Sequence, residues 1–357
     1  MSPADQKNQK PELRGMNKTE IESVIQKAGF KGFRSRQVFH WLYQRDARSF
    51  DEMANIPSSL RNFLSENYRI GSVKISETLT SSDGAMKILS ELHDGLKIES
   101  VLMPKDERRT LCISSQVGCR LGCDFCLTAR VGLIRNLTAA EIIDQVQCVK
   151  REILGEKQIT NVVVMGMGEP LMNMNALVPA LKLMTSPDAV VIPTRRVTVS
   201  TAGYVPGIYE LAEADTGVNL AISLNAPNDT LRSRLMPINR KYPIKKILEA
   251  CRAFPITKKR RITFEYIMLK DVNDAPEHAE QLAKLLRGIK CKINLIRYNE
   301  EEQLPYKASS LETIDKFAGV LVKHNYIVAV RHSMGQDIKA ACGQLAAGYL
   351  KEKDDNE

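Results

Sequence analysis

The strongest constraint on the fold is a long alternation of strand-like and helix-like segments that begins near Leu111. One helical stretch starts at Thr138 and has Glu141 three residues later, which forms a capping box before apolar residues at helical spacing. Repeated βα units of this kind predict parallel strands with helices outside, in an open sheet or a barrel. Short apolar runs predict the strands at 111–114, 162–165, 197–200, 218–224, 262–268, 292–296 and 327–330.

Polar residues gather directly after these predicted strands. In parallel α/β folds the ligand lies at the carboxyl ends of the strands, so we expect the polar segments to converge on one site. A partial barrel that holds one cofactor explains all of them. The segments are a cysteine loop after 111–114, then 166–170, 200–203 and 223–225, and Asn299 after a later strand.

Three cysteines, Cys119, Cys123 and Cys126, lie close together in the first of these loops. An iron–sulfur cluster whose ligands all come from the protein takes four cysteine thiolates. A cluster held by three cysteines therefore leaves one iron open to bind a small molecule. A disulfide is a weaker alternative, because the polar start of the chain shows no apolar signal segment and we expect a reducing, cytoplasmic location. A zinc site is also weaker, because the nearest histidines, His40 and His93, belong to no paired motif.

The cysteine spacing, with Phe125 between the last two thiols, resembles the signature of the radical S-adenosylmethionine enzymes. The resemblance implies one [4Fe-4S] cluster whose open iron is taken by the amino and carboxylate groups of S-adenosylmethionine. The glycine pair Gly166 and Gly168 alone would indicate a tight turn. Beside the cysteine loop, it resembles the element that binds the cofactor's amino group, with Glu169 as a charge-assisted acceptor.

The same resemblance implies further contacts to the cofactor from the segments after the later strands. Taken alone, Ser200 and Asn225 would indicate helix caps, and Asn299 a turn residue. Many relatives have histidine in place of Asn225, but an asparagine amide still forms hydrogen bonds to a ribose or a carboxylate. The expected contacts are Gly168, Glu169, Ser200, Ser223, Leu224, Asn225 and Asn299.

The region before the alternating segments predicts a small helical domain followed by short strands. Its basic residues surround Phe33 and Trp41, and they form either an RNA-contacting face or the polar side of an amphipathic bundle. The basic residues are Lys27, Lys31, Arg34, Arg36 and Arg45. The expected segments are a disordered start (1–13), a helical accessory, RNA-binding domain (14–70), a β-hairpin-like linker (71–104), the partial barrel with a carboxy-terminal cysteine loop (105–350) and a disordered tail (351–357).

The charge of the chain favours a polyanionic partner. A net charge of +9 with a pI near 9.1 attracts nucleic acid, although a solvated basic face has the same composition. Arg195, Arg196 and the run 258–261 are candidate phosphate contacts. A length of 357 residues suits one large α/β domain with a small accessory domain. No apolar stretch reaches the length of a membrane span, so we expect no membrane association.

A lone cysteine near the far end, Cys342, lies between the small residues Ala341 and Gly343. Such a cysteine is most often buried and inert. The segment 335–345, however, resembles the carboxy-terminal cysteine loop of the radical S-adenosylmethionine RNA methyltransferases of the RlmN and Cfr group. The similarity extends over nearly the whole chain, from Leu13 to Leu350, and includes the motifs at 33–41, 236–240 and 294–299.

The resemblance implies a radical methylation of an adenine carbon, which is electrophilic and has an unactivated C–H bond. One molecule of S-adenosylmethionine methylates the cysteine that matches Cys342. A second molecule is cleaved at the cluster to a radical that takes a hydrogen from the S-methyl group, and the resulting methylene radical adds to the ring. Two cofactor molecules are therefore used in each turnover.

The resemblance also assigns two further catalytic residues. Cys112 matches the resolving cysteine, which frees the product by forming a transient disulfide with Cys342. Glu99 matches the proposed acceptor of the ring proton, although without the resemblance a solvent-exposed strand residue would be the simpler interpretation. The remaining cysteines have no expected role beyond packing: Cys148, Cys251 and Cys291.

Within the group, the Gly-Met-Gly-Glu-Pro form at 166–170 and the segment 13–17 are more similar to RlmN. The resemblance then implies methylation at C2 of an adenosine in the peptidyl-transferase region of 23S rRNA and in the tRNA anticodon loop. Cfr-like methylation at C8, which confers antibiotic resistance, is the alternative. We expect a monomer that receives electrons from a low-potential donor such as flavodoxin or ferredoxin. A non-catalytic iron–sulfur RNA-binding protein and a radical enzyme for a small molecule or peptide stay open, but neither needs both Cys112 and Cys342 and a basic helical domain.

Overall fold

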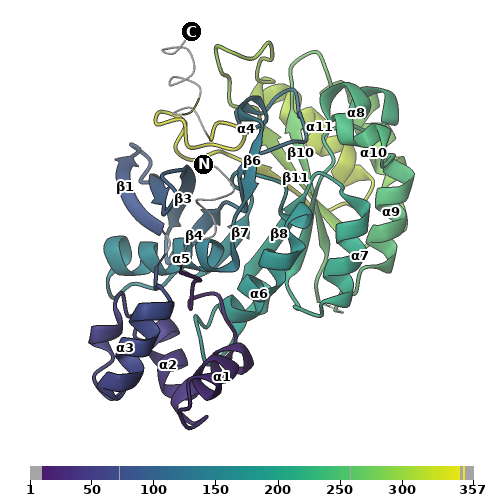
Figure 1. Ribbon diagram of the computed structural model, residues 1–357. Coiled ribbons are helices and arrows are strands. Elements are labelled where there is room, and N and C mark those ends of the chain that lie inside the picture. The colour runs from purple at the N-terminus through teal and green to yellow at the C-terminus, as the bar shows by residue number, and fades with distance from the viewer. Residues whose placement is uncertain (1–9, 72, 258, 346–348, 350–357) are drawn as a thin grey trace.

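The computed structural model describes residues 10–71, 73–257, 259–345 and 349. Its main element is a ten-stranded sheet with the order β1-β2-β3-β4-β7-β8-β9-β10-β11-β12 (Figure 1). The strands are β1 (Val73–Thr80), β2 (Met86–Leu92), β3 (Lys97–Lys105), β4 (Arg108–Ile113), β7 (Asn161–Val164), β8 (Val197–Thr201), β9 (Asn219–Ser223), β10 (Ile262–Met268), β11 (Cys291–Arg297) and β12 (Val328–Arg331). A separate two-stranded sheet pairs β5 (Gln116–Gly118) with β6 (Leu133–Asn136).

The helices fall into an amino-terminal group and a group interleaved with the strands. The first group is α1 (Lys18–Lys27), α2 (Arg34–Tyr43) and α3 (Ser58–Asn67). The second group is α4 (Leu127–Val131), α5 (Ala139–Val149), α6 (Met174–Thr185), α7 (Val205–Glu213), α8 (Asp229–Leu235), α9 (Ile244–Ala253), α10 (Pro276–Leu285) and α11 (Leu311–Lys323). None of the described helices has the length and apolar character that crossing a lipid bilayer requires.

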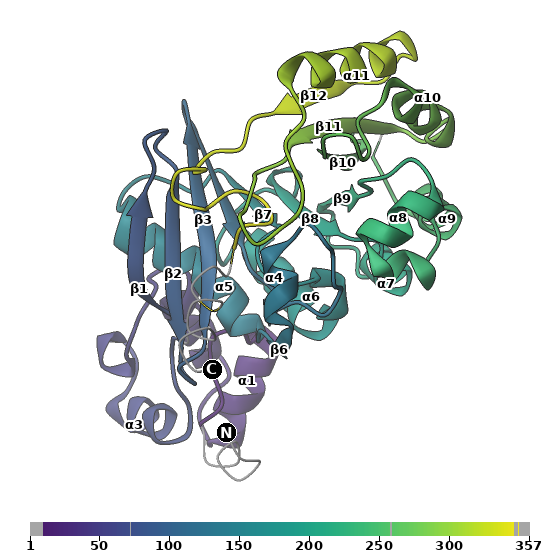
Figure 2. The same ribbon diagram turned by 90° about the horizontal axis from the view of Figure 1, so that it is seen from above.

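Six βα units form the barrel part of the sheet. Strands β4, β7, β8, β9, β10 and β11 run parallel, and short β12 adds a further parallel strand beside β11. Helices α5 to α11 lie on the outer side, as the view from above shows (Figure 2). The strand order begins with β1 and ends with β12, so the sheet stays open. The predicted partial barrel of βα units with a small amino-terminal helical domain is confirmed, and it has the (β/α)6 form.

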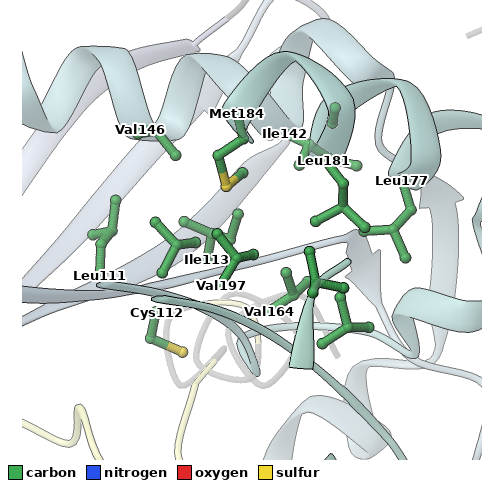
Figure 3. Packing of buried hydrophobic residues seen from close by; sticks show 14 of the residues in the cluster. Leu111, Cys112, Ile113, Ile142, Val146, Val164, Leu177, Leu181, Met184 and Val197 are labelled. Atoms are coloured by element: carbon green, nitrogen blue, oxygen red, sulfur yellow. The ribbon is translucent and has the colours of Figure 1, made fainter. Parts of the chain in front are cut away.

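Side-chain alternation decides which residues of β4 face the helices. Leu111 and Ile113 point towards α5 and α6, whereas Cys112 between them points to the opposite face (Figure 3). The apolar layer between sheet and helices stabilises the barrel because it removes these side chains from water. Its helical members include Ile142, Val146, Leu177, Leu181 and Met184, all buried. The face that carries Cys112 is therefore left for the functional site.

Three antiparallel strands extend the sheet beyond β4. β1 pairs with β2, β2 with β3 and β3 with β4. The β1–β2 and β2–β3 turns contain Asp-Gly pairs, and Gly84 and Gly95 both have positive φ. The segment 71–104, which the sequence predicts as a hairpin-like linker, therefore forms strands that are hydrogen-bonded into the main sheet. β3 carries Glu99 to the edge of the barrel in this way.

The start of the described chain is anchored against the barrel. Leu13 is fully buried, and its backbone N–H donates to the Arg69 carbonyl at 3.0 Å. Arg14 is also buried, forms an ion pair with Asp144 on α5, and donates to the Ala47 carbonyl at 2.7 Å. These contacts fix the helical domain to α5.

The predicted disordered start therefore needs correction for the part that is described. Residues 10–13 are ordered, because they supply a core leucine and pair with the chain near Arg69. Residues 1–9 and the predicted disordered tail, 351–357, lie outside the described residues.

Candidate active site

The cysteine loop connects β5 to α4 at the carboxyl end of β4. Its shape depends on a close approach at Gly118, which has φ +74° and whose missing Cβ would lie 1.7 Å from the Gly132 carbonyl oxygen. Cys119 N–H donates to that same carbonyl at 2.9 Å, and Cys126 N–H donates to the Cys123 carbonyl at 3.2 Å. The three thiols are half-buried.

The three cysteines pack against their own hydrophobic cluster, separate from the main core. This cluster contains Leu121, Phe125, Ala202, Leu235, Met236, Ile238, Leu269, Tyr298 and Tyr306. Burial raises the pKa of Cys119 to about 12, and burial together with the neighbouring thiols raises the pKa of Cys123 well above its ordinary value. Thiolates here need positive charge to compensate them, and the irons of a cluster supply it. The donor set therefore fits an iron–sulfur cluster.

The two alternatives for these cysteines find no support in the described residues. All eight cysteines are free thiols. In the part of the chain that the structure describes, no group of three His, Cys, Asp or Glu side chains is arranged to hold a metal ion. A cluster differs from a single ion in this respect, because each cysteine binds a different iron and the thiols need not meet at one point.

Glu169 lies next to the cysteine loop with its carboxylate held by the backbone. One carboxylate oxygen accepts from Ala202 N–H at 2.8 Å and the other from Leu171 N–H at 3.2 Å. Burial raises the pKa of this carboxyl to about 7, against the opposing effect of these hydrogen bonds. The preceding Gly168 has φ +101°, and a Cβ there would lie 2.5 Å from the Gln116 side chain. The sequence therefore needs glycine at this position to place Glu169.

Ser200 and Ser223 lie on the neighbouring strands β8 and β9, where their hydroxyl oxygens are 3.4 Å apart. Neither Ser200 nor Asn225 caps a helix, because Ser200 lies within β8 and the cap of α8 is Asn228. The side-chain oxygen of Asn225 accepts from Ile267 N–H at 3.0 Å, and its backbone has φ +59°. Asparagine is one of the residues that tolerates this conformation. Leu224, which lies between Ser223 and Asn225 in sequence, is fully buried.

Arg232 on α8 joins the ends of these two strands, a role that no local pattern in the sequence indicates. Its guanidinium is fully buried and donates to the Ala202 carbonyl at 2.6 Å and the Leu224 carbonyl at 3.0 Å. It also donates to the Asn239 side chain at 2.9 Å. Burial lowers the pKa of Arg232 to about 10, so the group stays cationic at neutral pH close to Cys123.

Cys342 stands at the second position of a tight turn formed by residues 341–344. Gln344 N–H donates to the Ala341 carbonyl at 3.1 Å, and Gly343 at the third position has φ +85°. The Gly343 carbonyl accepts from Leu127 N–H at 2.8 Å, which docks the turn beside the cysteine loop. Cys342 is exposed rather than buried, yet protein surrounds the thiol closely enough for desolvation to raise its pKa to about 11.

Asn299, after β11, contacts the segment that carries Cys342. Its side-chain N–H group donates to the Ser333 hydroxyl at 3.0 Å and to the Cys342 carbonyl at 3.4 Å. Its side-chain oxygen accepts from Gln336 at 3.0 Å. Asn299 is therefore more than a turn residue, because it links the end of β11 to the Cys342 segment.

Glu99 and Cys112 occupy the same face of β3 and β4. Cys112 lies opposite Val101, and Glu99 is two residues from Val101 along β3. Glu99 is buried, with an ion pair to Lys87 at 3.4 Å, and is not the solvent-exposed strand residue of the simpler interpretation. Burial raises the pKa of Cys112 well above its ordinary value, and charge on Cys342 raises it further.

Other predicted positions lie away from this site. Arg195 and Arg196 directly precede β8, and residues 259–261 directly precede β10. They therefore lie at the amino-terminal ends of the parallel strands, whereas the site lies at the carboxyl ends. Lys258 falls outside the described residues. In the helical domain, Phe33 is 48% exposed with the Arg34 guanidinium 4.7 Å from its ring centroid. The three remaining cysteines are buried, as packing residues are: Cys148, Cys251 and Cys291.

Two family models match the chain. The model of the Radical SAM superfamily matches residues 113–286, which begin at the end of β4 and include the cysteine loop. The model of the ribosomal RNA large subunit methyltransferase N-terminal domain matches residues 11–70, which contain α1 to α3.

Curated relatives and a solved structure resemble the chain over most of its length. The dual-specificity RNA methyltransferase RlmN of Syntrophus aciditrophicus is 47% identical over 96% of this chain and 98% of the relative. The protein of the same name from Geotalea uraniireducens is 47% identical over 94% of this chain and 97% of the relative. The crystal structure of a radical SAM methyltransferase from Sphaerobacter thermophilus has a TM-score of 0.89 at 41% identity, and the match covers 94% of this chain and 99% of that chain.

Proposed function

This chain belongs to the RlmN family of radical S-adenosylmethionine RNA methyltransferases, and on that premise we propose that it methylates C2 of an adenosine in the peptidyl-transferase region of 23S rRNA and in the tRNA anticodon loop. The name of the relatives, dual-specificity RNA methyltransferase, supports more than one RNA substrate. The observation that carries the proposal is the docking of the Cys342 turn beside the cluster loop, where the Gly343 carbonyl accepts from Leu127 N–H at 2.8 Å.

Membership of the family implies a [4Fe-4S] cluster and S-adenosylmethionine. Cys119, Cys123 and Cys126 would hold the cluster, and Glu169 would accept hydrogen bonds from the cofactor's amine. Gly168, Ser200, Ser223, Leu224, Asn225 and Asn299 complete the proposed cofactor contacts. When bound, the cluster and cofactor supply a methyl group and a radical that abstracts hydrogen, with two cofactor molecules used per turnover.

The proposed chemistry of the protein itself involves three side chains. Cys342 loses its thiol proton and accepts the methyl group on sulfur. After this methyl loses one hydrogen atom, its carbon bonds to C2 of the adenine and Glu99 accepts the ring proton. The electron left over by this loss of a proton from a radical adduct would return to the cluster that Cys119, Cys123 and Cys126 would hold. The Cys112 thiolate then attacks the Cys342 sulfur, forms a disulfide, and breaks the bond between that sulfur and the transferred carbon, which takes up a proton to become the methyl group.

The position of Glu99 supports its role as proton acceptor. It lies on the same sheet face as Cys112, two residues along β3 from the Val101 that pairs with Cys112. The adenine must leave its stack to enter this site. When the target base lies in a loop, the free-energy cost of this step is limited to local unstacking.

The decisive experiment uses the full chain with its cluster reconstituted under anaerobic conditions. S-adenosylmethionine, reduced flavodoxin and protein-free 23S rRNA or tRNA are added, and the methylated position is mapped by mass spectrometry of nucleosides. We expect 2-methyladenosine with wild type and with Cys251→Ala, and none with Cys342→Ala. Methyl at C8 would replace the C2 assignment with the Cfr-like alternative. Unchanged methylation in Cys342→Ala would overturn the proposed chemistry.

We also propose that the protein acts as a cytoplasmic monomer and receives electrons from a low-potential protein such as flavodoxin or ferredoxin. The free state of all eight cysteines supports a reducing compartment. Light scattering of the cluster-loaded protein tests the oligomeric state, and a dimer at working concentration would contradict it.

A further inference from the structure

Glu301 is a buried carboxylate that the chemistry above does not use. It lies in the segment after β11, and one of its carboxylate oxygens accepts from the Gln344 side-chain amide at 2.7 Å. The other oxygen lies 3.5 Å from the Lys339 ammonium group. Both partners belong to the segment that carries Cys342, on either side of it in sequence. The carboxylate thus bridges the two sides of the Cys342 turn.

Gln344 transmits this contact to the turn. Its side-chain oxygen accepts from the Ala341 N–H at 3.1 Å, while its own backbone N–H donates to the Ala341 carbonyl at 3.1 Å. The side-chain amide therefore closes the turn at one end and is fixed to Glu301 at the other. Gln344 is buried, so water does not readily replace a lost acceptor, and a buried amide without one is unfavourable.

Two backbone carbonyls of the turn also accept hydrogen bonds, that of Gly343 from Leu127 N–H at 2.8 Å and that of Cys342 from the Asn299 side chain at 3.4 Å. Further contacts hold the start of the segment. Asp337 accepts from Ser82 N–H at 3.0 Å, and Gly335 N–H donates to Asp83 at 2.9 Å, which ties the start of the segment to the β1–β2 turn. These anchors are five or more residues from Cys342. The orientation of the thiol therefore depends on the contacts within 341–344, on the two hydrogen bonds from Leu127 and Asn299, and on the carboxylate that fixes the Gln344 side chain.

We propose that Glu301 is a positioning residue for Cys342, which acts through Gln344 to hold the turn in the orientation that presents the thiol to the cluster loop and to Cys112. The inference rests on the proposed function, in which Cys342 carries the methyl group. A displacement of about 1 Å at a reacting atom slows a reaction by about a hundredfold. Loss of the carboxylate should therefore slow the reactions of Cys342 with groups held in the protein, such as the Cys112 thiol, without removing the Cys342 thiol from solvent.

The test compares Glu301→Ala with Glu301→Gln in the full chain. Diamide oxidises the cluster-free protein, and mass spectrometry follows formation of the Cys112–Cys342 disulfide, in which two thiols lose their hydrogens to the diamide. We expect Glu301→Ala to slow this step by about tenfold or more, and Glu301→Gln, which keeps an acceptor oxygen for Gln344, to recover most of the rate. Alkylation of Cys342 by iodoacetamide should not slow, because the thiol stays exposed.

A matched control is Glu300→Ala. Glu300 is exposed and accepts from Ala308 N–H and from Lys307, both at 3.0 Å, so its loss should leave the disulfide rate unchanged. If Glu301→Ala does not fold, Gln344→Asn provides the same test, because the shorter side chain cannot span Ala341 and Glu301. A wild-type disulfide rate in Glu301→Ala or in Gln344→Asn would overturn the proposal.

The same proteins separate this inference from the proposed function. In the cluster-loaded wild type, S-adenosylmethionine should place one methyl group on Cys342, and in Glu301→Ala this single-turnover rate should fall while the KM for RNA stays the same. If Cys342 stays unmethylated in wild type, the proposal that Cys342 carries the methyl group is wrong. The disulfide rates would still report whether Glu301 orients the turn.

Discussion

Glu99 and Cys112 lie on the same face of two hydrogen-bonded antiparallel strands, in diagonal positions, because Cys112 pairs with Val101 and Glu99 is two residues from Val101. Diagonal neighbours in such a pair are about 7–8 Å apart at the backbone, within reach of long side chains. The turn that carries Cys342 docks beside the cysteine loop, where the Gly343 carbonyl accepts from Leu127 N–H at 2.8 Å. Strand register thus brings together the proposed proton acceptor and the proposed resolving thiol, and one long-range turn brings Cys342 to the neighbouring loop.

The first prediction concerns Glu99→Gln. The amide keeps the size of the side chain but does not accept a proton, so methylation of RNA should fall by about a hundredfold or more, the usual contribution of a positioned base. Methylation of Cys342 itself should persist, because that step precedes the ring proton's removal. Quantitative mass spectrometry of the Cys342 peptide and of the RNA nucleosides measures both. An equal decrease in methylation of Cys342 and of RNA would instead indicate that the substitution disrupts the structure of the site.

A second prediction follows for Cys112→Ala. Without the resolving thiol, the bond between Cys342 and the transferred carbon should remain, so that protein and RNA stay covalently linked. A denaturing gel should then show a protein band of reduced mobility that ribonuclease returns to its normal position. Cys148→Ala is the matched control, because Cys148 is also a buried cysteine but donates to the Val73 carbonyl on another side of the fold. Release of methylated RNA by Cys112→Ala would contradict the resolving role.

The sequence predicted the parts of this site that local patterns encode. The period of apolar residues predicted the parallel strands, and the cysteine spacing predicted the loop after β4, because both depend on residues close together in the chain. Ser200 taken alone would indicate a helix cap, but it lies within a strand, because β8 continues to Thr201. Such boundary errors follow from the tertiary hydrogen bonds that extend a strand.

Contacts between distant segments could not be predicted in this way. Arg232 interacts with the ends of β8 and β9, and Gln344 contacts Glu301 over 43 positions in sequence. Nothing in the local sequence of either residue distinguishes it from a surface side chain. The same is true of Gln116, whose side chain accepts from the Glu169 N–H at 2.8 Å and so positions the proposed cofactor ligand.

The third prediction concerns the pH dependence of Glu169. Burial raises its pKa from 4.5 to about 7, so the folded cluster-free protein binds a proton more tightly than the unfolded chain between these values. Stability should therefore fall as pH rises from about 4.5 to about 7, by about 3 kcal/mol from this group. In Glu169→Gln that loss should be absent, so urea unfolding at pH 5 and pH 8 should show a smaller decrease than in wild type. The same variant should bind S-adenosylmethionine more weakly, because the charged acceptor is gone.

The last prediction concerns Arg232→Met. The substitution leaves a fully buried site in which the carbonyls of Ala202 and Leu224 lose their donor, so the free energy of unfolding should fall by about 3 kcal/mol or more. The exposed Arg234→Met on the same helix should change it by less than about 0.5 kcal/mol. Urea unfolding of both cluster-free variants measures the difference. Because Arg232 fixes the ends of the strands that carry Ser200 and Ser223, Arg232→Met should also weaken cofactor binding, and a variant as stable as wild type would show that the strand ends hold together without it.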